Sequence, residues 1–533
     1  MATTMQSNVP ATTVETAATT VFKNEPFTDF SRLENQRAMR EALEKVRRQL
    51  GREYENVIGG HRVKSSNKIQ SINPSHPEQV VGVFQKAGAE DVPAAVEAAL
   101  AAYEGWSRTP VTERAELLFK IAHTLRVRKF EWAAWLVYEV GKNWAEADAD
   151  VAETIDFAEF YGREALRLAK SVPTIQYPGE HDELRYIPLG VGAVIPPWNF
   201  PSAIMAGMTM ASIVSGNTVV LKPSSDALTI AAQFFQVLEE CGMPDGVVNL
   251  VSGSGASFGN ELVKHPKIRF VAFTGSKEVG LHIHELAAKT QPGQIWIKRT
   301  VLEMGGKDAI VVDSDSDLDE AVNGVIASAF GFSGQKCSAC SRAIVDERVY
   351  DKFVERLKDR AEKLTVGPTE ENPNMGPVVN AAAQKTILGF VGKALDEGGR
   401  LITGGHAVEG LNGYFIQPTI ISEVKPGSTL EQNEVFGPVL AVIRCKNFED
   451  GLRIANDTEF GLTGAVYTKS GERIELAKQE FHVGNLYINR KCTGAMVAAH
   501  PFGGFNMSGT DSKAGGPDYL LLFTQAKSIA RKL

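Results

Sequence analysis

The chain has 533 residues, 43% hydrophobic and 23% charged, and a formal net charge of −8. The length suggests two to four domains of roughly 100–200 residues each, and the charge disfavours nucleic acid and membrane surfaces as partners. Five scattered cysteines do not make a disulfide framework, so a cytoplasmic location is expected.

The N-terminal part is expected to be helical after an unstructured start. Residues 1–30 are predicted to form a mobile tail, because 1–21 are rich in Thr, Ala and Ser and match no targeting signal. Apolar residues then recur at helical spacing, which predicts helices at 31–50, 94–102 and 113–127.

From Gly190 onward, short β-branched runs alternate with helical segments. This order predicts βαβ units and a parallel sheet with helices on both faces. Ligands of such sheets bind at the carboxyl ends of the strands. We predict strands at 190–195, 218–221, 247–251 and 268–273, and helices at 202–215, 226–241 and 276–289.

A second unit of the same kind begins near Lys307 and continues to about Arg490, with a strand at 309–312 and a helix at 318–330. The fold class expected is therefore α/β, with two doubly wound domains. The polar segment 176–189 and the chain end 519–533 look like excursions from the compact body. They predict a homo-oligomer, at least a dimer.

Several motifs lie at the ends of these predicted elements. They are Pro197–Asn199, Phe273–Ser276, Trp296–Arg299, Glu303–Lys307, Gly334–Cys337, Glu434–Pro438 and Pro501–Phe505. In this order along the chain they resemble the aldehyde dehydrogenase superfamily. Within it, Trp296–Arg299 and Pro501–Phe505 resemble the 1-pyrroline-5-carboxylate dehydrogenases.

The resemblance implies an aldehyde dehydrogenase-like division of the chain. Residues 31–170 and 188–303 would bind the cofactor, and 304–490 would form the catalytic domain. Residues 491–509 would anchor the substrate, while 171–187 and 510–533 would mediate oligomerisation.

Three residues carry the predicted chemistry. Aldehyde oxidation through a thioester needs a thiolate, which Cys337 supplies. We expect a nearby helix end to lower its pKa. The Asn199 amide and the Cys337 N–H suit an oxyanion, and Glu303 is the carboxylate that the family uses to activate water.

Other interpretations of these residues stay open. Asn199 is also a typical helix cap, and Glu303 a typical charge at a strand end. Gly255–Gly259 matches the Gly-x-Ser-x-Gly pattern of serine hydrolases, although it also reads as a glycine-rich turn. Cys337 and Cys340 form a Cys-x-x-Cys without a second pair, so no metal is expected.

The cofactor expected from the resemblance is NAD. Gly275 and Gly280 have the spacing of the family, and Ser276 at a helix start is the candidate phosphate contact. Ser225 stands where many NAD-preferring relatives have an acid, so we expect NADP to be tolerated. The remaining cofactor contacts implied by the family are Lys222, Glu434, Phe436, Pro197 and Trp198.

The substrate expected is L-glutamate γ-semialdehyde, the open form of 1-pyrroline-5-carboxylate, which is oxidised to L-glutamate in the second step of proline degradation. Backbone N–H groups of Gly494 and Ala495, with Ser338, would hold its α-carboxylate, and Phe200 and Phe505 would pack on its methylenes. By local pattern alone, Gly494 simply turns the chain. The alternative substrate is succinate semialdehyde, for which a basic side chain is expected.

Overall fold

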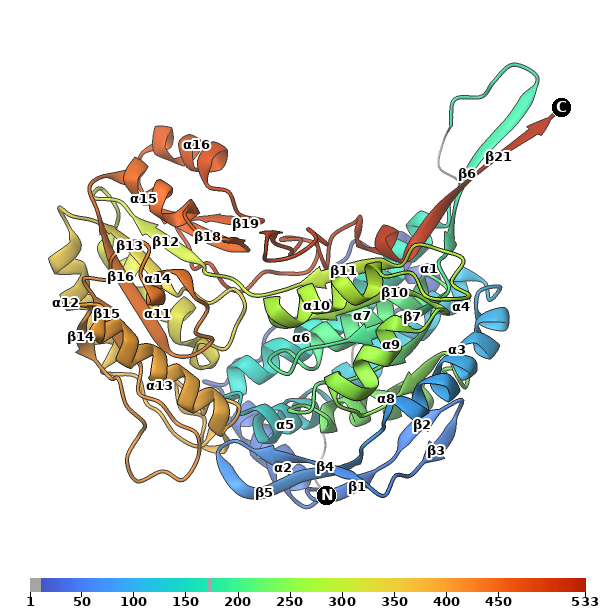
Figure 1. Ribbon diagram of the computed structural model, residues 1–533, viewed down its shortest axis with the longest axis horizontal. Coiled ribbons are helices and arrows are strands. Elements are labelled where there is room, and N and C mark those ends of the chain that lie inside the picture. The colour runs from blue at the N-terminus through green and yellow to red at the C-terminus, as the bar shows by residue number, and fades with distance from the viewer. Residues whose placement is uncertain (1–10, 171–173) are drawn as a thin grey trace.

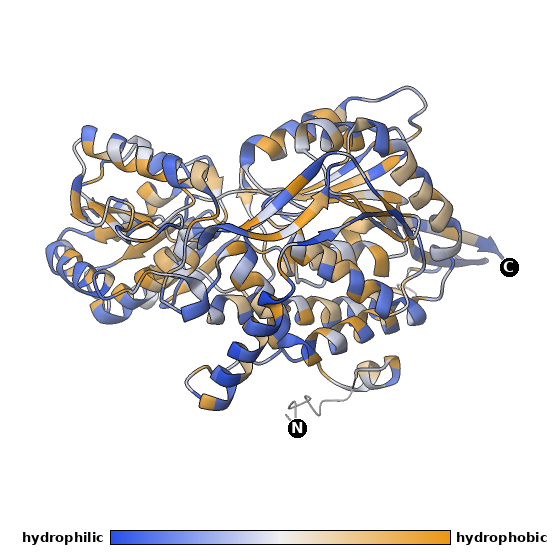
Figure 2. Ribbon diagram, turned by 90° about the horizontal axis from the view of Figure 1, so that it is seen from below, coloured by the Kyte–Doolittle hydropathy of each residue, from blue (hydrophilic) through white to orange (hydrophobic). Residues whose placement is uncertain are grey.

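The computed structural model describes residues 11–170 and 174–533. Two seven-stranded sheets organise them into two lobes (Figure 1). The predicted α/β fold with two doubly wound units is confirmed. Figure 2 shows apolar strands inside each lobe and hydrophilic outer helix faces. None of the described helices is long and apolar enough to cross a membrane.

The first sheet has the order β11-β10-β7-β8-β9-β2-β3, and its first five strands are parallel. These strands are nearly continuous apolar runs because helices bury both of their faces. The strands are β2 (Asn56–Ile58), β3 (His61–Val63), β7 (Val191–Ile195), β8 (Thr218–Leu221), β9 (Val248–Leu250), β10 (Ile268–Thr274) and β11 (Arg299–Glu303).

Helices α3, α9 and α10 pack on one face of this sheet, and α7 and α8 on the other, with α5 and α6 behind them. Their bounds, with those of the two N-terminal neighbours, are α2 (Leu33–Arg47), α3 (Val92–Trp106), α4 (Val111–Val127), α5 (Lys129–Val140), α6 (Trp144–Leu168), α7 (Ala203–Val214), α8 (Thr229–Glu240), α9 (Asn260–Lys264) and α10 (Lys277–Ala288).

The second sheet has the order β14-β15-β16-β13-β12-β18-β19 and is parallel except for β14. Its strands are β12 (Ala309–Val312), β13 (Arg342–Asp346), β14 (Arg400–Thr403), β15 (Thr419–Ser422), β16 (Val439–Cys445), β18 (Thr463–Tyr467) and β19 (Asn485–Ile488). The covering helices are α11 (Leu318–Phe330) and α12 (Tyr350–Ala361) on one face, and α13 (Ala381–Asp396), α15 (Phe448–Asn456) and α16 (Gly471–Glu480) on the other.

Two smaller sheets lie outside the lobes. Strands β6 (Glu180–Pro188) and β21 (Thr524–Lys532) pair antiparallel over nine residues and project from the body as an arm (Figure 1). Strands β1 (Arg52–Tyr54), β4 (Lys68–Asn73) and β5 (His76–Gln85) form a three-stranded sheet below the first lobe. The arm joins the polar segment and the chain end that the sequence marked as excursions.

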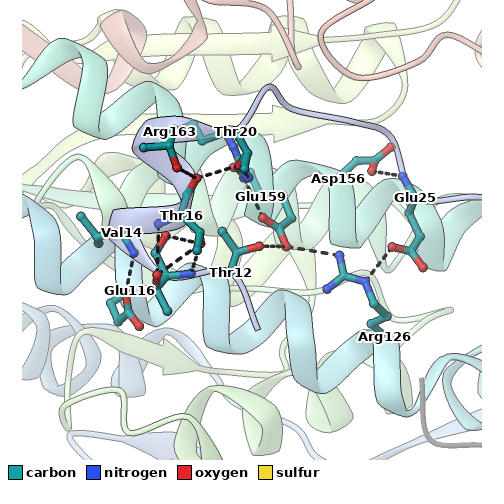
Figure 3. A network of polar contacts seen from close by, with 12 residues as sticks. Thr12, Val14, Thr16, Thr20, Glu25, Glu116, Arg126, Asp156, Glu159 and Arg163 are labelled. Atoms are coloured by element: carbon teal, nitrogen blue, oxygen red, sulfur yellow. Dashed lines mark hydrogen bonds and ion pairs between the residues drawn. The ribbon is translucent and has the colours of Figure 1, made fainter. Parts of the chain in front are cut away.

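The N-terminal segment lies along α4 and α6 (Figure 3). Helix α1 (Val14–Thr19) begins it, and Thr12 donates a hydrogen bond to Glu159 at 2.9 Å. Arg126 joins Glu25 and Glu159 at 2.8 and 3.2 Å. Of the tail predicted over 1–30, residues 1–10 lie outside the described part, and the remainder is held by these contacts.

Candidate active site

Two cavities meet at Cys337. One, of about 730 Å³, lies at the carboxyl ends of the first sheet's strands, between α10 and Phe436. The other, of about 560 Å³, lies between α6, α7 and the loop after β19. Cys337 and Thr274 line both cavities. A molecule in either cavity can therefore reach the sulfur.

A strained turn presents Cys337. Helix α11 ends at Phe330, and the next turn contains Phe332 and Ser333 at φ +50° and +53°. Such conformations persist only where the surroundings enforce them. Ser333 donates to the Gly376 carbonyl at 2.7 Å, and the Gln335 amide donates to the Pro377 carbonyl and accepts from Val379 N–H. These hydrogen bonds thus hold the strained turn that places Cys337 where the two cavities meet.

The resting thiol is not activated by its surroundings. Burial raises the pKa of Cys337 well above its ordinary value, and Asp308, Glu434 and Glu303 act in the same direction to the extent that each is ionised. The expected lowering by a helix end is therefore wrong: the Ser338 N–H does favour the thiolate, but burial outweighs it. A reaction in which the Cys337 sulfur attacks a substrate therefore requires that the thiol first lose its proton.

Asn199 is buried and does not cap a helix. Its side-chain amide donates to the carbonyl of Gln335 at 3.1 Å, two residues before the nucleophile. Helix α7 begins after Ser202 instead. Since an amide nitrogen carries two hydrogens, Asn199 retains one N–H on the wall of the first cavity.

Glu303 ends β11 and lines the second cavity with Cys337. Its carboxyl group accepts from the Ser512 hydroxyl at 2.6 Å and from the N–H groups of Ser512 and Gly504. Burial outweighs these bonds and raises the pKa of Glu303 to about 7. A carboxyl group with this pKa can exchange a proton near neutrality.

The first cavity fits a dinucleotide. Ser276 caps α10 and Gly275 precedes it, so the helix N-terminus opens onto the cavity. The buried Lys222 ammonium contacts only the carbonyls of Pro223 and Gly253 among the described residues, and burial lowers its pKa to about 8. A buried cation without a carboxylate partner suits the oxygen-rich groups of a nucleotide.

The other predicted cofactor residues line the same cavity. Pro197 and Trp198 lie beside Phe436, whose ring meets Trp198 edge-on with centroids 5.5 Å apart. The Glu434 carboxyl group accepts from Gly306 N–H at 3.0 Å, and burial raises its pKa to about 7. Ser225 is here too.

The second cavity collects most of the predicted substrate residues. Ser338, Phe200, Ala495 and Gly494 line it, and Gly494 has φ +75°. Phe505 does not line it: β20 (Phe505–Asn506) pairs with β17 (Phe460–Gly461), and the Phe505 ring packs on His482. Phe502, from the same motif, lines the cavity instead. The expectation that Phe505 packs on the substrate is therefore corrected to Phe502.

The sequence did not reveal an ion pair in this cavity. Lys336 and Glu146 face each other at 2.6 Å and both line it. Burial opposes the charge of Glu146, but the Lys336 ammonium outweighs it and lowers the pKa of Glu146. The position of Lys336 beside Cys337 was the available signal. Glu146 lies in a helix that we did not predict.

The serine-hydrolase pattern has another role. Gly255–Gly259 forms a helical turn on the wall of the first cavity, and Ser257 pairs with Ser254 at 2.7 Å. No described histidine accepts from Ser257. A glycine-rich turn is therefore the interpretation of Gly255–Gly259 that fits.

Cys340, the second cysteine of the Cys-x-x-Cys pattern, is buried, and its thiol donates a hydrogen bond to the Arg342 carbonyl.

The class of protein follows from comparison with known families. Residues 61–529 match the aldehyde dehydrogenase family, so the chain belongs to it.

Its relatives narrow the class. The chain is 53% identical to 1-pyrroline-5-carboxylate dehydrogenase of Geobacillus thermodenitrificans, over 96% of this chain and 99% of the relative. A structure of 1-pyrroline-5-carboxylate dehydrogenase from Thermus with bound NAD matches with a TM-score of 0.95 and 51% identity, over 96% of this chain and 99% of that one. The structure of proline utilization A from Bdellovibrio bacteriovorus matches with a TM-score of 0.94 and 45% identity, over 96% of this chain and 53% of that one.

Proposed function

We propose that the chain oxidises L-glutamate γ-semialdehyde, the open form of 1-pyrroline-5-carboxylate, to L-glutamate with NAD, as the second step of proline degradation. The observation that best supports this substrate is the composition of the second cavity. It joins Cys337 to Gly494 and Ala495 and contains the pair Lys336 and Glu146. An amino acid with a distal aldehyde presents the complementary groups, a carboxylate and an ammonium.

The chain's own residues supply most of the chemistry. The Cys337 thiol releases its proton to solvent, its sulfur adds to the aldehyde carbon, and the Asn199 amide with the Cys337 N–H holds the oxyanion. Bound NAD would supply the acceptor for the hydride that leaves that carbon, and Cys337 would then carry the acyl group as a thioester. Glu303 then takes a proton from a water that attacks the thioester, and the C–S bond breaks to release the carboxylate.

In this proposal the first lobe, 31–170 and 188–303, holds NAD, with Lys222, Ser225, Gly275, Ser276, Glu434, Phe436, Pro197 and Trp198 as contacts. Residues 304–490 carry the nucleophile, and 491–509 anchor the substrate through backbone N–H groups of Gly494 and Ala495. Ser338, Phe200 and Phe502 complete its site. Segments 171–187 and 510–533, to which most of the arm belongs, serve oligomerisation in a cytoplasmic enzyme.

A panel of aldehydes compared by kcat/KM tests the substrate. Succinate semialdehyde is the competitor, because Arg490, Lys491 and Lys336 also line the cavity. It lacks the ammonium that Glu146 would bind, so we expect L-glutamate γ-semialdehyde to have the higher kcat/KM. A higher value for succinate semialdehyde or for propanal would refute the substrate but not the dehydrogenase.

A further inference from the structure

Asp308 is a buried acid beneath the nucleophile to which the mechanism assigns no role. It follows the crossing from β11 to β12, and its side chain is 2% exposed. One carboxyl oxygen, Oδ1, accepts from Thr463 N–H at 2.7 Å. The other, Oδ2, has no hydrogen-bond partner among the described residues. An unpartnered buried carboxylate oxygen is costly, so this one requires an explanation.

A second unpartnered acceptor faces the same space above Gly306. No N–H or O–H of the described residues donates to the carbonyl oxygen of Cys337. A Cβ built on Gly306 would lie 2.6 Å from Asp308 Oδ2 and 2.7 Å from this carbonyl oxygen. The two oxygens therefore approach one point, which stays open only because residue 306 is glycine. Two acceptors that face one small buried space repel unless one of them carries a hydrogen.

We propose that Asp308 is a positioning residue for the nucleophile: its carboxyl group is protonated and donates a hydrogen bond from Oδ2 to the carbonyl oxygen of Cys337. With a protonated Asp308, Oδ2 acts as the donor and the Cys337 carbonyl oxygen as its acceptor, so neither oxygen is left without a partner. A carboxylic acid that stays protonated at neutral pH in order to donate a hydrogen bond is an established device of active sites. The bond fixes the main chain that carries both the sulfur and the oxyanion-binding N–H.

The electrostatic surroundings favour the neutral form. Burial raises the pKa of Asp308 well above its ordinary value, and Cys492 and Glu434 act in the same direction. The other ionisable neighbours are Lys307, whose pKa burial lowers to about 7, Cys337 and Cys340. A neutral Asp308 also removes one negative charge that would oppose formation of the Cys337 thiolate.

The test measures the rate of Cys337 alkylation by iodoacetamide against pH in the full-length enzyme. Asp308→Asn keeps the shape, the acceptor for Thr463 and a neutral donor, so we expect the same pH midpoint and a kcat well above that of Asp308→Ala. Asp308→Ala removes the donor, and kcat should fall about fivefold or more for one lost hydrogen bond. Asp313→Asn is the control, because this buried acid pairs with Arg473 away from the cavity.

Three results would overturn the proposal. A midpoint that moves to lower pH in Asp308→Asn would mean that Asp308 is an anion. Wild-type kcat and alkylation in Asp308→Ala would mean that it positions nothing. Infrared spectra of wild-type enzyme with isotope-labelled aspartate, at a mildly alkaline pH, must contain a band of the un-ionised acid. Its absence would refute the proposal even if the variants fail to fold.

Discussion

Gly494 allows the substrate site to be tested without touching the chemistry. Its φ of +75° is a left-handed conformation, and a Cβ there would approach Cε of Lys491 to 3.3 Å. Holding an L-residue in this conformation costs about 1–2 kcal/mol, which is about a 5- to 30-fold loss in occupancy. We expect Gly494→Val to raise KM for L-glutamate γ-semialdehyde by about this factor. KM for propanal, which has no carboxylate to anchor, should change far less.

The assay is NADH formation at saturating NAD, with kcat and KM determined for both aldehydes. Gly410→Val is the matched control, because Gly410 has φ +79° and open space at its Cβ position in a remote loop. Thermal denaturation checks that both variants are folded. An equal rise in KM for propanal, or the same rise in Gly410→Val, would show that Gly494 acts through general stability and not through the carboxylate.

Three further outcomes are expected. Cys337→Ala should form no NADH yet bind NAD in calorimetry, and NADH formation by this variant would remove Cys337 from the mechanism. Glu303→Gln should give a burst of NADH followed by slow turnover. The wild-type steady-state rate should rise as pH passes through about 7, because only the ionised Glu303 accepts a proton from water; a variant with the same pH profile would contradict this. Ser225→Glu should abolish use of NADP while NAD is still used, since a carboxylate repels the 2′-phosphate, and unchanged kcat/KM for NADP would refute the role of Ser225.

The sequence predicted the sheets better than the N-terminal helices. The strand at Thr218–Leu221 has the predicted bounds, because a short buried β-branched run has few alternatives. Helix α6 was missed because its polar and apolar faces cannot be told apart in the sequence. Its acids Asp148, Asp150, Asp156 and Glu159 are buried against partners such as Lys142 and Arg126, so charge does not mark its outer face.

The motifs pointed to Cys337 and to the cavity residues near it, but not to the charges that surround its thiol. The pKa of Cys337 depends on Asp308, Glu434 and Glu303, which the fold brings together from separate segments. The same holds for the pair of Lys336 with Glu146, 190 positions apart. Phe502 and Phe505 look equivalent in one motif, and only the pairing of β20 with β17 separates them.

The crossing between the two lobes explains why one short segment serves both cavities. Glu303 ends the last strand of the first sheet and faces the second cavity. Gly306 N–H then holds Glu434 on the wall of the first cavity, and Asp308 lies beneath Cys337 immediately before the second sheet begins. The carboxylate that we propose activates water and the acid that we propose supports Cys337 are thus five residues apart on one chain segment. Their relative placement depends on this segment and not on how the two lobes pack.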